Sequence, residues 1–226
     1  MMKLRARRLT GCLLVLVCML AGCEQRKEPA RKETPQLPVF TGTVVCVGDS
    51  LTAGLGVNEE KAYPAQLEHK LRSAGLNWRV VNAGISGETS SGTLSRIDWV
   101  LKLKPDIVVL ETGANDGLRG TDPAITRKNL DRIIQVLLKN DVIVVLAGMR
   151  MVANLGPDYT SAFAAVYPEL ANTYGLLLVP FFLEDVAGEP SLNQADGIHP
   201  NAEGYRIITN TIYPVVKQAI DRKGKR

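Results

Sequence analysis

The chain has 226 residues, of which 46% are hydrophobic and 22% charged, and its formal net charge is +4. This composition is typical of a globular protein and excludes collagen-like, disordered and polytopic membrane proteins. Four basic side chains and no acidic one lie in residues 1–22, so the remaining 23 of the 27 basic residues equal the 23 acidic ones. Nucleic-acid binding usually requires an excess of positive charge, so we expect no nucleic-acid partner.

Residues 1–22 have the three-part pattern of a secretory signal peptide. Basic side chains come first, followed by the apolar run Leu13–Leu20 and then small residues. The run is about half as long as the roughly 20 apolar residues that span a bilayer, which argues against a permanent transmembrane helix. Leu20-Ala21-Gly22-Cys23 resembles the lipobox of bacterial lipoproteins. The resemblance implies cleavage before Cys23 and lipidation of that residue, whereas an ordinary signal peptide would leave Cys23 free.

Residues 23–38 are predicted to be the lipidated cysteine and a flexible linker. Glu24–Pro38 is rich in charge and proline and nearly empty of apolar side chains, so it cannot order itself by burial. The lipoprotein resemblance associates Glu24, at the second mature position, with export to the outer membrane of Gram-negative cells. We therefore expect a protein of the cell envelope, anchored to the outer membrane through Cys23 and facing the periplasm.

Residues 39–226 are long enough for one well-buried core and contain no internal repeat or second linker. Continuous apolar runs indicate strands buried on both faces, as in a parallel sheet. These runs are Thr43–Val47, Trp78–Val81, Ile107–Leu110, Val142–Leu146 and Leu176–Val179. Helical patterns lie between them, at Ala62–Ala74, Ser91–Lys102, Leu130–Leu138, Asp158–Tyr174 and Ala202–Ile220, with Asp122 as the expected N-cap of the third. The alternation predicts a three-layer, doubly wound α/β sandwich with a central parallel five-stranded sheet.

Cysteine chemistry is not expected in this domain. Cys12 and Cys18 leave with the leader and Cys23 carries lipid, so no disulfide can form within the mature monomer. Cys46 lies inside the first apolar run, where a small buried hydrophobe is the common outcome. A catalytic thiol is less favoured there, because nothing nearby in the sequence would stabilise a thiolate.

A serine follows the first predicted strand, at the end of the sheet where doubly wound folds bind ligands. Ser50 in Gly48-Asp49-Ser50-Leu51-Thr52 could be a nucleophile, because the N–H groups of such a turn lie beside its hydroxyl. Taken alone, the turn favours an N-cap serine instead. A phosphate-binding turn is less favoured, since neither glycine-rich phosphate motif follows this strand.

The ends of the other strands carry further candidates. Gly87 and Asn115 follow the second and third strands and could supply oxyanion-hole donors, although ordinary turns use the same residues. Of the two histidines, His69 falls in a helical pattern with charged neighbours and is expected at the surface. His199 comes three residues after Asp196, whose carboxylate could fix the imidazole tautomer or merely close a turn.

From about Thr43 to Ile220 the chain resembles the SGNH hydrolase superfamily, also called GDSL esterases and lipases. The family's blocks are a nucleophilic serine in Gly-Asp-Ser, a glycine, an asparagine in Gly-x-Asn-Asp and the pair Asp-x-x-His, and all occur here in that order. The resemblance implies a flavodoxin-like SGNH fold and no metal or organic cofactor. It also assigns the catalytic residues Ser50, Asp196 and His199, and an oxyanion hole made by the N–H groups of Ser50 and Gly87 with the Asn115 side chain.

Three segments are most similar to the bacterial thioesterase I, arylesterase and lysophospholipase branch. They are Asn115–Gly120, Met149–Gly156 and Asp196–Asn201, and one departure is Ala114, where the branch commonly has glycine. The branch implies hydrolysis of carboxylic acyl esters, thioesters or lysophospholipids, without an obligate protein partner. A carbohydrate O-acetyl esterase of the cell envelope and a non-catalytic binding lipoprotein are the alternatives.

Two further expectations concern the surroundings of Ser50. Asp49 is expected to hydrogen-bond its own turn, and neither Asp49 nor Asp116 is counted among the catalytic residues. An apolar groove should select the acyl chain. Met149, Met151, Val152 and Leu155 could line it, although core packing is the commoner fate of such side chains.

Overall fold

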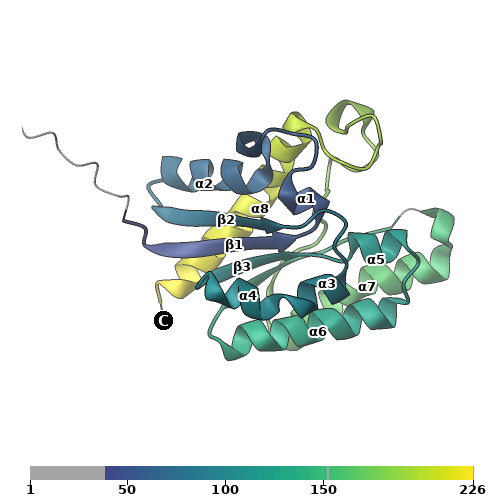
Figure 1. Cartoon of the computed structure of the whole chain (residues 1–226), viewed down its shortest axis with the longest axis horizontal. Coiled ribbons are helices and arrows are strands. Elements are labelled where there is room, and N and C mark those ends of the chain that lie inside the picture. Colours follow the sequence, from purple (N-terminus) through teal and green to yellow (C-terminus); the bar gives the residue numbers. More distant parts are fainter. Residues whose placement is uncertain (1–38, 152, 226) are drawn as a thin grey trace, which may run out of the picture. The chain divides into compact units, whose positions relative to one another are not determined.

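Five parallel strands form one sheet in the order β2-β1-β3-β4-β5 (Figure 1). The computed structural model describes residues 39–151 and 153–225. The strands are β1 (Gly42–Gly48), β2 (Trp78–Gly84), β3 (Ile107–Glu111), β4 (Ile143–Ala147) and β5 (Leu177–Val179). This confirms the predicted parallel sheet. The signal peptide, the lipidated Cys23 and the linker were predicted for residues that lie outside the described ones.

The central strands are apolar throughout because both of their faces are covered. Every residue of β3 and β4 is buried, and so are Val44–Gly48 of β1. The edge strand β2 mixes buried and exposed positions. Cys46 is buried within β1, and burial raises the pKa of its thiol to about 12, which confirms it as a small hydrophobe rather than a reactive thiolate.

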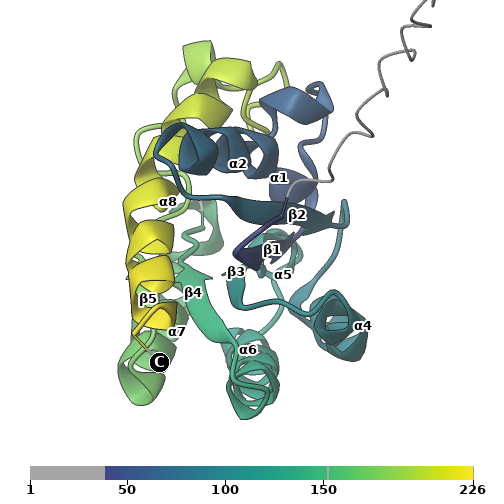
Figure 2. The same ribbon diagram turned by 90° about the vertical axis from the view of Figure 1, so that its left-hand side faces the viewer.

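Helices cover both faces of the sheet, with α2 and α8 on one side and α4, α6 and α7 on the other (Figure 2). The longer helices are α2 (Tyr63–Ser73), α6 (Pro123–Lys139), α7 (Pro157–Tyr174) and α8 (Ala202–Lys223). The short ones are α1 (Ser50–Ala53), α3 (Ser90–Ser95), α4 (Ile97–Lys102) and α5 (Ala114–Leu118), with 3₁₀ turns at Glu59–Lys61, Ala153–Leu155 and Pro190–Leu192. None of the helices in the described residues is long and apolar enough to cross a membrane.

Local sequence explains where these helices begin and end. The side chain of Asp122 caps α6 by accepting a hydrogen bond from the Ala124 N–H, as predicted, with Pro123 in the first turn. The single helix predicted over Ser91–Lys102 is wrong. The structure has two short helices, because the backbone of Arg96 leaves the helical region at φ −110°, ψ 10°.

The sheet order places the end of β1 at the point where the chain reverses direction across the sheet. From β1 the chain goes to β2 on one side and then returns to β3 on the other. Ligands bind at such switch points in doubly wound folds, beyond the carboxyl ends of the strands. The short helices α1 and α5 follow β1 and β3 at this end of the sheet (Figure 1).

Candidate active site

Ser50 is the first residue of α1, directly after β1. The N-cap of α1 is Asp49, whose carboxylate accepts the Leu51 N–H over 3.0 Å. Ser50 is therefore not the cap, and the N-cap interpretation of this serine is wrong. The helix ends after one turn at Gly54, which has the positive φ of 79° that glycine tolerates best. This tight turn leaves the Ser50 hydroxyl without a structural role and only 8% of the residue exposed.

The histidine and the aspartate of the last motif lie in line with this hydroxyl. His199 Nε2 is 2.9 Å from Ser50 Oγ, and His199 Nδ1 is 2.7 Å from Asp196 Oδ2. The other oxygen of Asp196 accepts the N–H groups of His199 and Ile198. These backbone donors, first that of His199, hold the pKa of Asp196 well below its usual range. Asp196 therefore stays ionised beside the imidazole.

The loop that carries His199 is tied down on both sides. Asn193 and Pro200 form an antiparallel bridge, and the Gln194 N–H donates to the His199 carbonyl over 2.8 Å. The Gln194 side chain donates to the Leu55 carbonyl over 2.7 Å, which joins this loop to the segment after α1. These contacts hold the imidazole against a serine that precedes it by 149 residues.

The two backbone N–H groups of the predicted oxyanion hole have no hydrogen-bond acceptor in the ranges that the structure describes. Within residues 39–151 and 153–225, the N–H groups of Ser50 and Gly87 have no protein acceptor. Gly87 adopts φ +79°, and its carbonyl accepts a hydrogen bond from Arg119 over 2.9 Å. The loop of Gly87 is joined to the turn Gly48–Ser50, called here the serine turn, by the Ile85 N–H, which donates to Gly48 O over 2.9 Å. Preorganised N–H groups of this kind can stabilise an oxyanion.

Asn115 lies at the site, but its amide is already engaged. Its Nδ2 donates to Asp49 Oδ2 and to the Glu88 carbonyl, each over 3.0 Å. An amide nitrogen has two N–H groups. A ligand oxygen must therefore share one of these two donors. The sequence did not indicate the Asp49–Asn115 contact, because the two residues lie 66 positions apart.

A buried carboxyl group is hydrogen-bonded to the serine turn and to the residue that follows Leu51. Glu111, the last residue of β3, accepts the Thr52 hydroxyl over 2.8 Å and the Asp49 N–H over 3.4 Å. Burial raises the pKa of Asp49 to about 6 and raises that of Glu111 well above its ordinary value. Asp49 has N–H donors from Leu51 and Asn115, so it carries the charge and Glu111 is the protonated partner. Glu111 was missed by the sequence analysis, although an acid closing an apolar strand was a visible signal.

The last acid of the asparagine motif has a structural role. Asp116 is buried and accepts the Ser90 N–H over 2.7 Å and the Ser90 hydroxyl over 2.5 Å. These bonds attach α5 to the start of α3, immediately after the loop of Gly87. This explains why an acid follows Asn115 without giving it a part in the chemistry.

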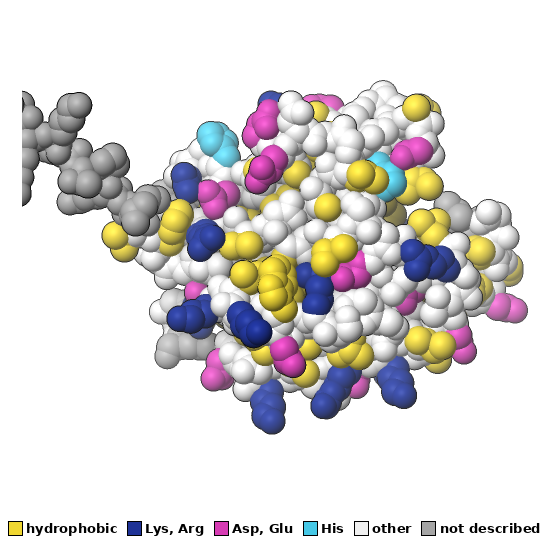
Figure 3. Space-filling view, in the orientation of Figure 1, with side chains coloured by type: hydrophobic (Ala, Val, Ile, Leu, Met, Phe, Trp, Pro, Cys, Tyr) yellow, Lys and Arg dark blue, Asp and Glu magenta, His cyan; other side chains and the backbone are white. Residues whose placement is uncertain are grey.

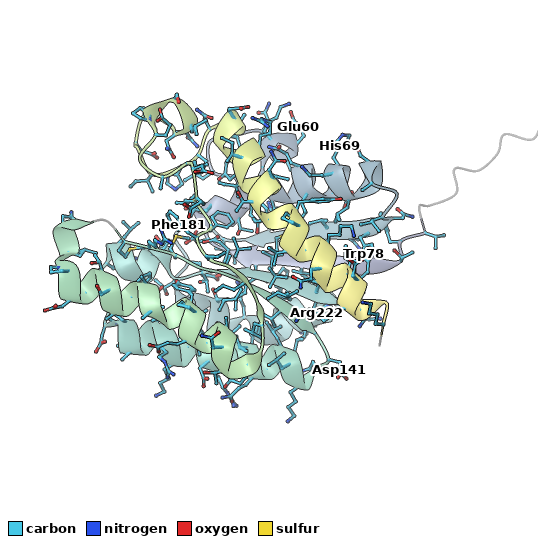
Figure 4. The ribbon with its side chains drawn as sticks, turned by 180° about the vertical axis from the view of Figure 1, so that it is seen from behind. Glu60, His69, Trp78, Asp141, Phe181 and Arg222 are labelled. Carbon is cyan, nitrogen blue, oxygen red and sulfur yellow. The ribbon has the colours of Figure 1, made fainter. Side chains whose placement is uncertain are left out.

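An apolar cavity of about 200 Å³ lies beside the serine turn. Its lining includes Leu51, Ala114, Leu118, Met149, Met151, Phe181 and Ile198. Met149 and Met151 line the cavity, and Met149 is also packed in the core at 2% exposure, so both of the expected fates occur. Leu155 is not part of the lining, and Val152 lies outside the described residues. The guanidinium of Arg150 stacks over Phe181 at 4.8 Å, and Figure 4 shows Phe181 at the opposite end of the sheet from Trp78.

A larger polar groove of about 650 Å³ runs between α2 and α8. It contains His69, which is exposed on α2 as predicted (Figure 4). No serine–histidine pair like that of Ser50 and His199 is present among its described lining residues. Nor do three metal-ligating side chains come together anywhere in the described part of the chain.

A serine, a histidine and an aspartate joined in this order, on a doubly wound α/β fold, are the arrangement of a serine hydrolase. Residues 46–207 match the GDSL-like Lipase/Acylhydrolase family, and the chain belongs to this family. It is a hydrolase that acts on ester bonds.

Named relatives agree with this class. Esterase TesA of Pseudomonas aeruginosa is 38% identical over 95% of this chain and 98% of its own length. Thioesterase 1/protease 1/lysophospholipase L1 of Escherichia coli K12 is 41% identical over 74% of this chain and 80% of its own length. The solved structure of AlinE4, an SGNH-hydrolase family esterase, is 42% identical with a TM-score of 0.68, over 80% of this chain and 97% of that one.

Proposed function

We propose that this esterase hydrolyses carboxylic acyl esters and thioesters through an acyl-enzyme on Ser50. The observation that carries the proposal is the continuous contact from Asp196 through His199 to Ser50 Oγ, with distances of 2.7 and 2.9 Å. A serine hydroxyl is a weak nucleophile until a neighbouring base accepts its proton. His199 Nε2, which contacts the hydroxyl, is in place to be that base.

The reaction proceeds in two halves. Ser50 Oγ attacks the acyl carbonyl while His199 Nε2 takes the hydroxyl proton, and the proton then passes to the departing alcohol or thiol. Water then attacks the acyl-enzyme with His199 again as the base, which releases the acid and restores Ser50. Asp196 stays ionised throughout, holding the Nδ1–H tautomer and stabilising the imidazolium that forms in each half.

The tetrahedral oxyanion is stabilised by the N–H groups of Ser50 and Gly87, with Asn115 as the third donor. Removing one such donor typically costs about 2.7–4 kcal/mol of transition-state stabilisation. Support comes from the two backbone N–H groups, which have no acceptor among the described residues, and from the attachment of their loops to each other. Asn115 supplies its donor by sharing an N–H that Asp49 or the Glu88 carbonyl holds in the free enzyme.

The substrate is proposed to be an acyl lipid or a related small ester, without a cofactor. The cavity beside Ser50 is lined mainly by apolar side chains, which suits a hydrocarbon acyl group rather than a sugar. The relatives named esterase and thioesterase 1/lysophospholipase L1 fit the same substrate class. Lysophospholipids, acyl thioesters and aryl esters are therefore the substrates to test first.

We also propose that the enzyme is a lipoprotein of the cell envelope. Support comes from the sequence alone, from the lipobox resemblance at Cys23 and the charged, proline-rich segment after it. Such an anchor would place the active site beside the outer membrane, facing the periplasm. Metabolic labelling with a palmitate analogue tests this: the wild-type chain should carry the label and the Cys23→Ser variant should not.

The catalytic proposal is tested with p-nitrophenyl esters from acetyl to palmitoyl. We expect the wild-type chain to turn over and Ser50→Ala to lose about a thousandfold or more in kcat/KM. Ser73→Ala, at an exposed serine on α2, is the matched control and should behave as wild type. An optimum at acetyl, with release of acetate from acetylated polysaccharide, would favour the carbohydrate esterase instead. If the folded wild-type chain hydrolyses none of these esters, the non-catalytic binding lipoprotein becomes the favoured interpretation.

A further inference from the structure

Exposed hydrophobic side chains gather around the nucleophile. Among the described residues, the large hydrophobic side chains most exposed to solvent number seven. Four of them flank the active site and are called here the apolar rim: Leu55, Ile85, Leu118 and Ile198. Each is between 45% and 50% exposed. Exposed apolar surface gathered in one place marks an interaction site, whereas single exposed hydrophobic residues are ordinary.

Backbone contacts place two of these residues beside Ser50. The Leu55 N–H donates to Ser50 O over 3.1 Å, and the Ile85 N–H donates to Gly48 O over 2.9 Å. The other two, Leu118 and Ile198, line the cavity beside Ser50. All four rim residues therefore lie next to the serine turn or along the cavity beside it. In Figure 3, hydrophobic side chains lie around the histidine that neighbours an acidic side chain, at the upper right.

Two guanidinium groups lie beside the rim. Arg119 follows Leu118 directly and Arg150 lines the same cavity as Leu118 and Ile198. Neither guanidinium has a carboxylate partner in the part of the chain that the structure describes. Asp196 contacts His199, and Glu88 pairs with Arg96. Three exposed acids, Glu184, Asp185 and Glu189, lie in the segment that supplies Leu183 and Gly188 to the cavity, so the guanidinium groups are local positive positions on a face of mixed charge. Two such guanidinium groups beside exposed apolar side chains are complementary to a surface of anionic headgroups over hydrocarbon.

We propose that the apolar rim, with Arg119 and Arg150, docks the enzyme onto a lipid surface that carries anionic headgroups. The proposal rests on the proposed function for its purpose and goes beyond it by naming the surface from which substrate is taken. The rim side chains enter the boundary between headgroups and acyl chains, and the two guanidinium groups contact phosphates. An acyl chain then passes from the bilayer into the cavity without crossing water.

Vesicle flotation tests the proposal in residues 24–226, which include the whole compact unit Val39–Arg226, so that neither the apolar leader nor a lipid on Cys23 contributes. The vesicles are phosphatidylcholine alone or an equal mixture with phosphatidylglycerol. The variant Leu55→Ser/Ile85→Ser should partition at least about tenfold more weakly into the mixed vesicles. Its urea unfolding midpoint should match that of the parent chain, so that the weaker partitioning reports the loss of exposed apolar side chains and not a loss of folding. Val39→Ser, at an exposed apolar position before the start of β1, should change neither value.

The arginines are tested in the same assay. The parent chain should partition about fivefold or more weakly into vesicles without phosphatidylglycerol than into the mixed vesicles. Arg150→Gln should lose most of this preference for the mixed vesicles. Arg79 is an exposed residue on β2, so the control variant Arg79→Gln should keep the preference for the mixed vesicles. Equal partitioning of the rim variant, the Val39→Ser control and the parent chain would overturn the proposal. Rim-dependent flotation by a chain that hydrolyses no ester would instead leave docking in place and refute the proposed function.

Discussion

Asn115 Nδ2 lies 3.0 Å from Asp49 Oδ2, and this contact joins the serine turn to the side chain proposed as an oxyanion donor. The same carboxylate caps α1 through the Leu51 N–H. Asp49 thus fixes the start of the helix that presents Ser50 and the orientation of the amide opposite it. Its position next to the nucleophile serves geometry rather than proton transfer.

Replacing Asp49 by asparagine tests this orienting role. The introduced side chain can still cap α1, but its amide nitrogen can meet Asn115 Nδ2 with a donor instead of an acceptor. A small displacement of a donor can cost about a hundredfold, so we expect kcat to fall about 10- to 100-fold with KM little changed. Asp122→Asn alters a cap of the same kind on α6 and should leave kcat unchanged. Steady-state kinetics on one p-nitrophenyl ester measures both constants. A wild-type kcat in Asp49→Asn would show that Asp49 does not position Asn115.

The buried charge of Asp49 should also appear in the pH dependence of stability. Its pKa is about 6 in the folded chain and about 3.9 when unfolded, so between these values the folded state holds the extra proton. The Asp49 contribution to the free energy of unfolding therefore falls as pH rises through this window and levels off above it, while the raised pKa of Glu111 adds a further fall of the same sign. Urea titrations at pH 4.5 and 7.5 should show that the loss of unfolding free energy between the two pH values is about 2 kcal/mol smaller in Asp49→Asn than in the wild type. The pKa of Asp196 is lowered, so its protonation changes the free energy of unfolding only in more acid solution, below this window.

Local sequence patterns were sufficient for the sheet and for most helices. The runs that became β1, β3 and β4 are apolar because both faces of these strands are buried, and the apolar runs indicate that burial directly. Asp122 and Pro123 likewise indicate the start of α6. The break at Arg96 was not predicted because it follows from tertiary contacts. That side chain turns back to Glu88 and to the Ala83 carbonyl.

The site was predictable only where its residues stand in short motifs. The positions of Ser50, Asp196 and His199 came from such motifs, and the structure brings them into contact. The bonds from Asn115 to Asp49 and from Thr52 to Glu111 link residues 66 and 59 positions apart. Helix and strand periodicities do not link residues so far apart, so the sequence could show an acid at the end of β3 but not its pairing with the serine turn.

Glu111 should act as a neutral hydrogen-bonding group rather than as a charge. Glu111→Gln keeps an oxygen for the Asp49 N–H and the Thr52 hydroxyl, so it should stay within about 1 kcal/mol of wild type in stability. Glu111→Ala leaves both donors unpaired above a cavity and should cost about 2–4 kcal/mol, with a loss of activity. Urea unfolding at neutral pH measures both variants. Equal destabilisation by glutamine and alanine would mean that the folded enzyme needs an ionised Glu111.

The pair of Arg96 and Glu88 should set how firmly the Gly87 loop is held. Both side chains are nearly buried, at 13% and 7% exposure, and Arg96 donates to both carboxylate oxygens of Glu88 and to the Ala83 carbonyl. Arg96→Met leaves the Glu88 charge buried and unpaired, so it should cost about 3–5 kcal/mol of stability. It should also lower kcat, because Glu88 follows Gly87 and its carbonyl holds Asn115.

A surface pair in the same molecule provides the control for Arg96. Arg72 and Glu68 form an ion pair on α2 with side-chain exposures of 48% and 24%, so Arg72→Met should cost at most about 1 kcal/mol and leave kcat unchanged. The double variant Arg96→Met/Glu88→Gln removes the stranded charge and should recover part of the stability while kcat stays low. Recovery of kcat together with stability would show that the loop needs only a folded domain and not this pair. Unfolding titrations and kinetics on the same preparations separate the two outcomes.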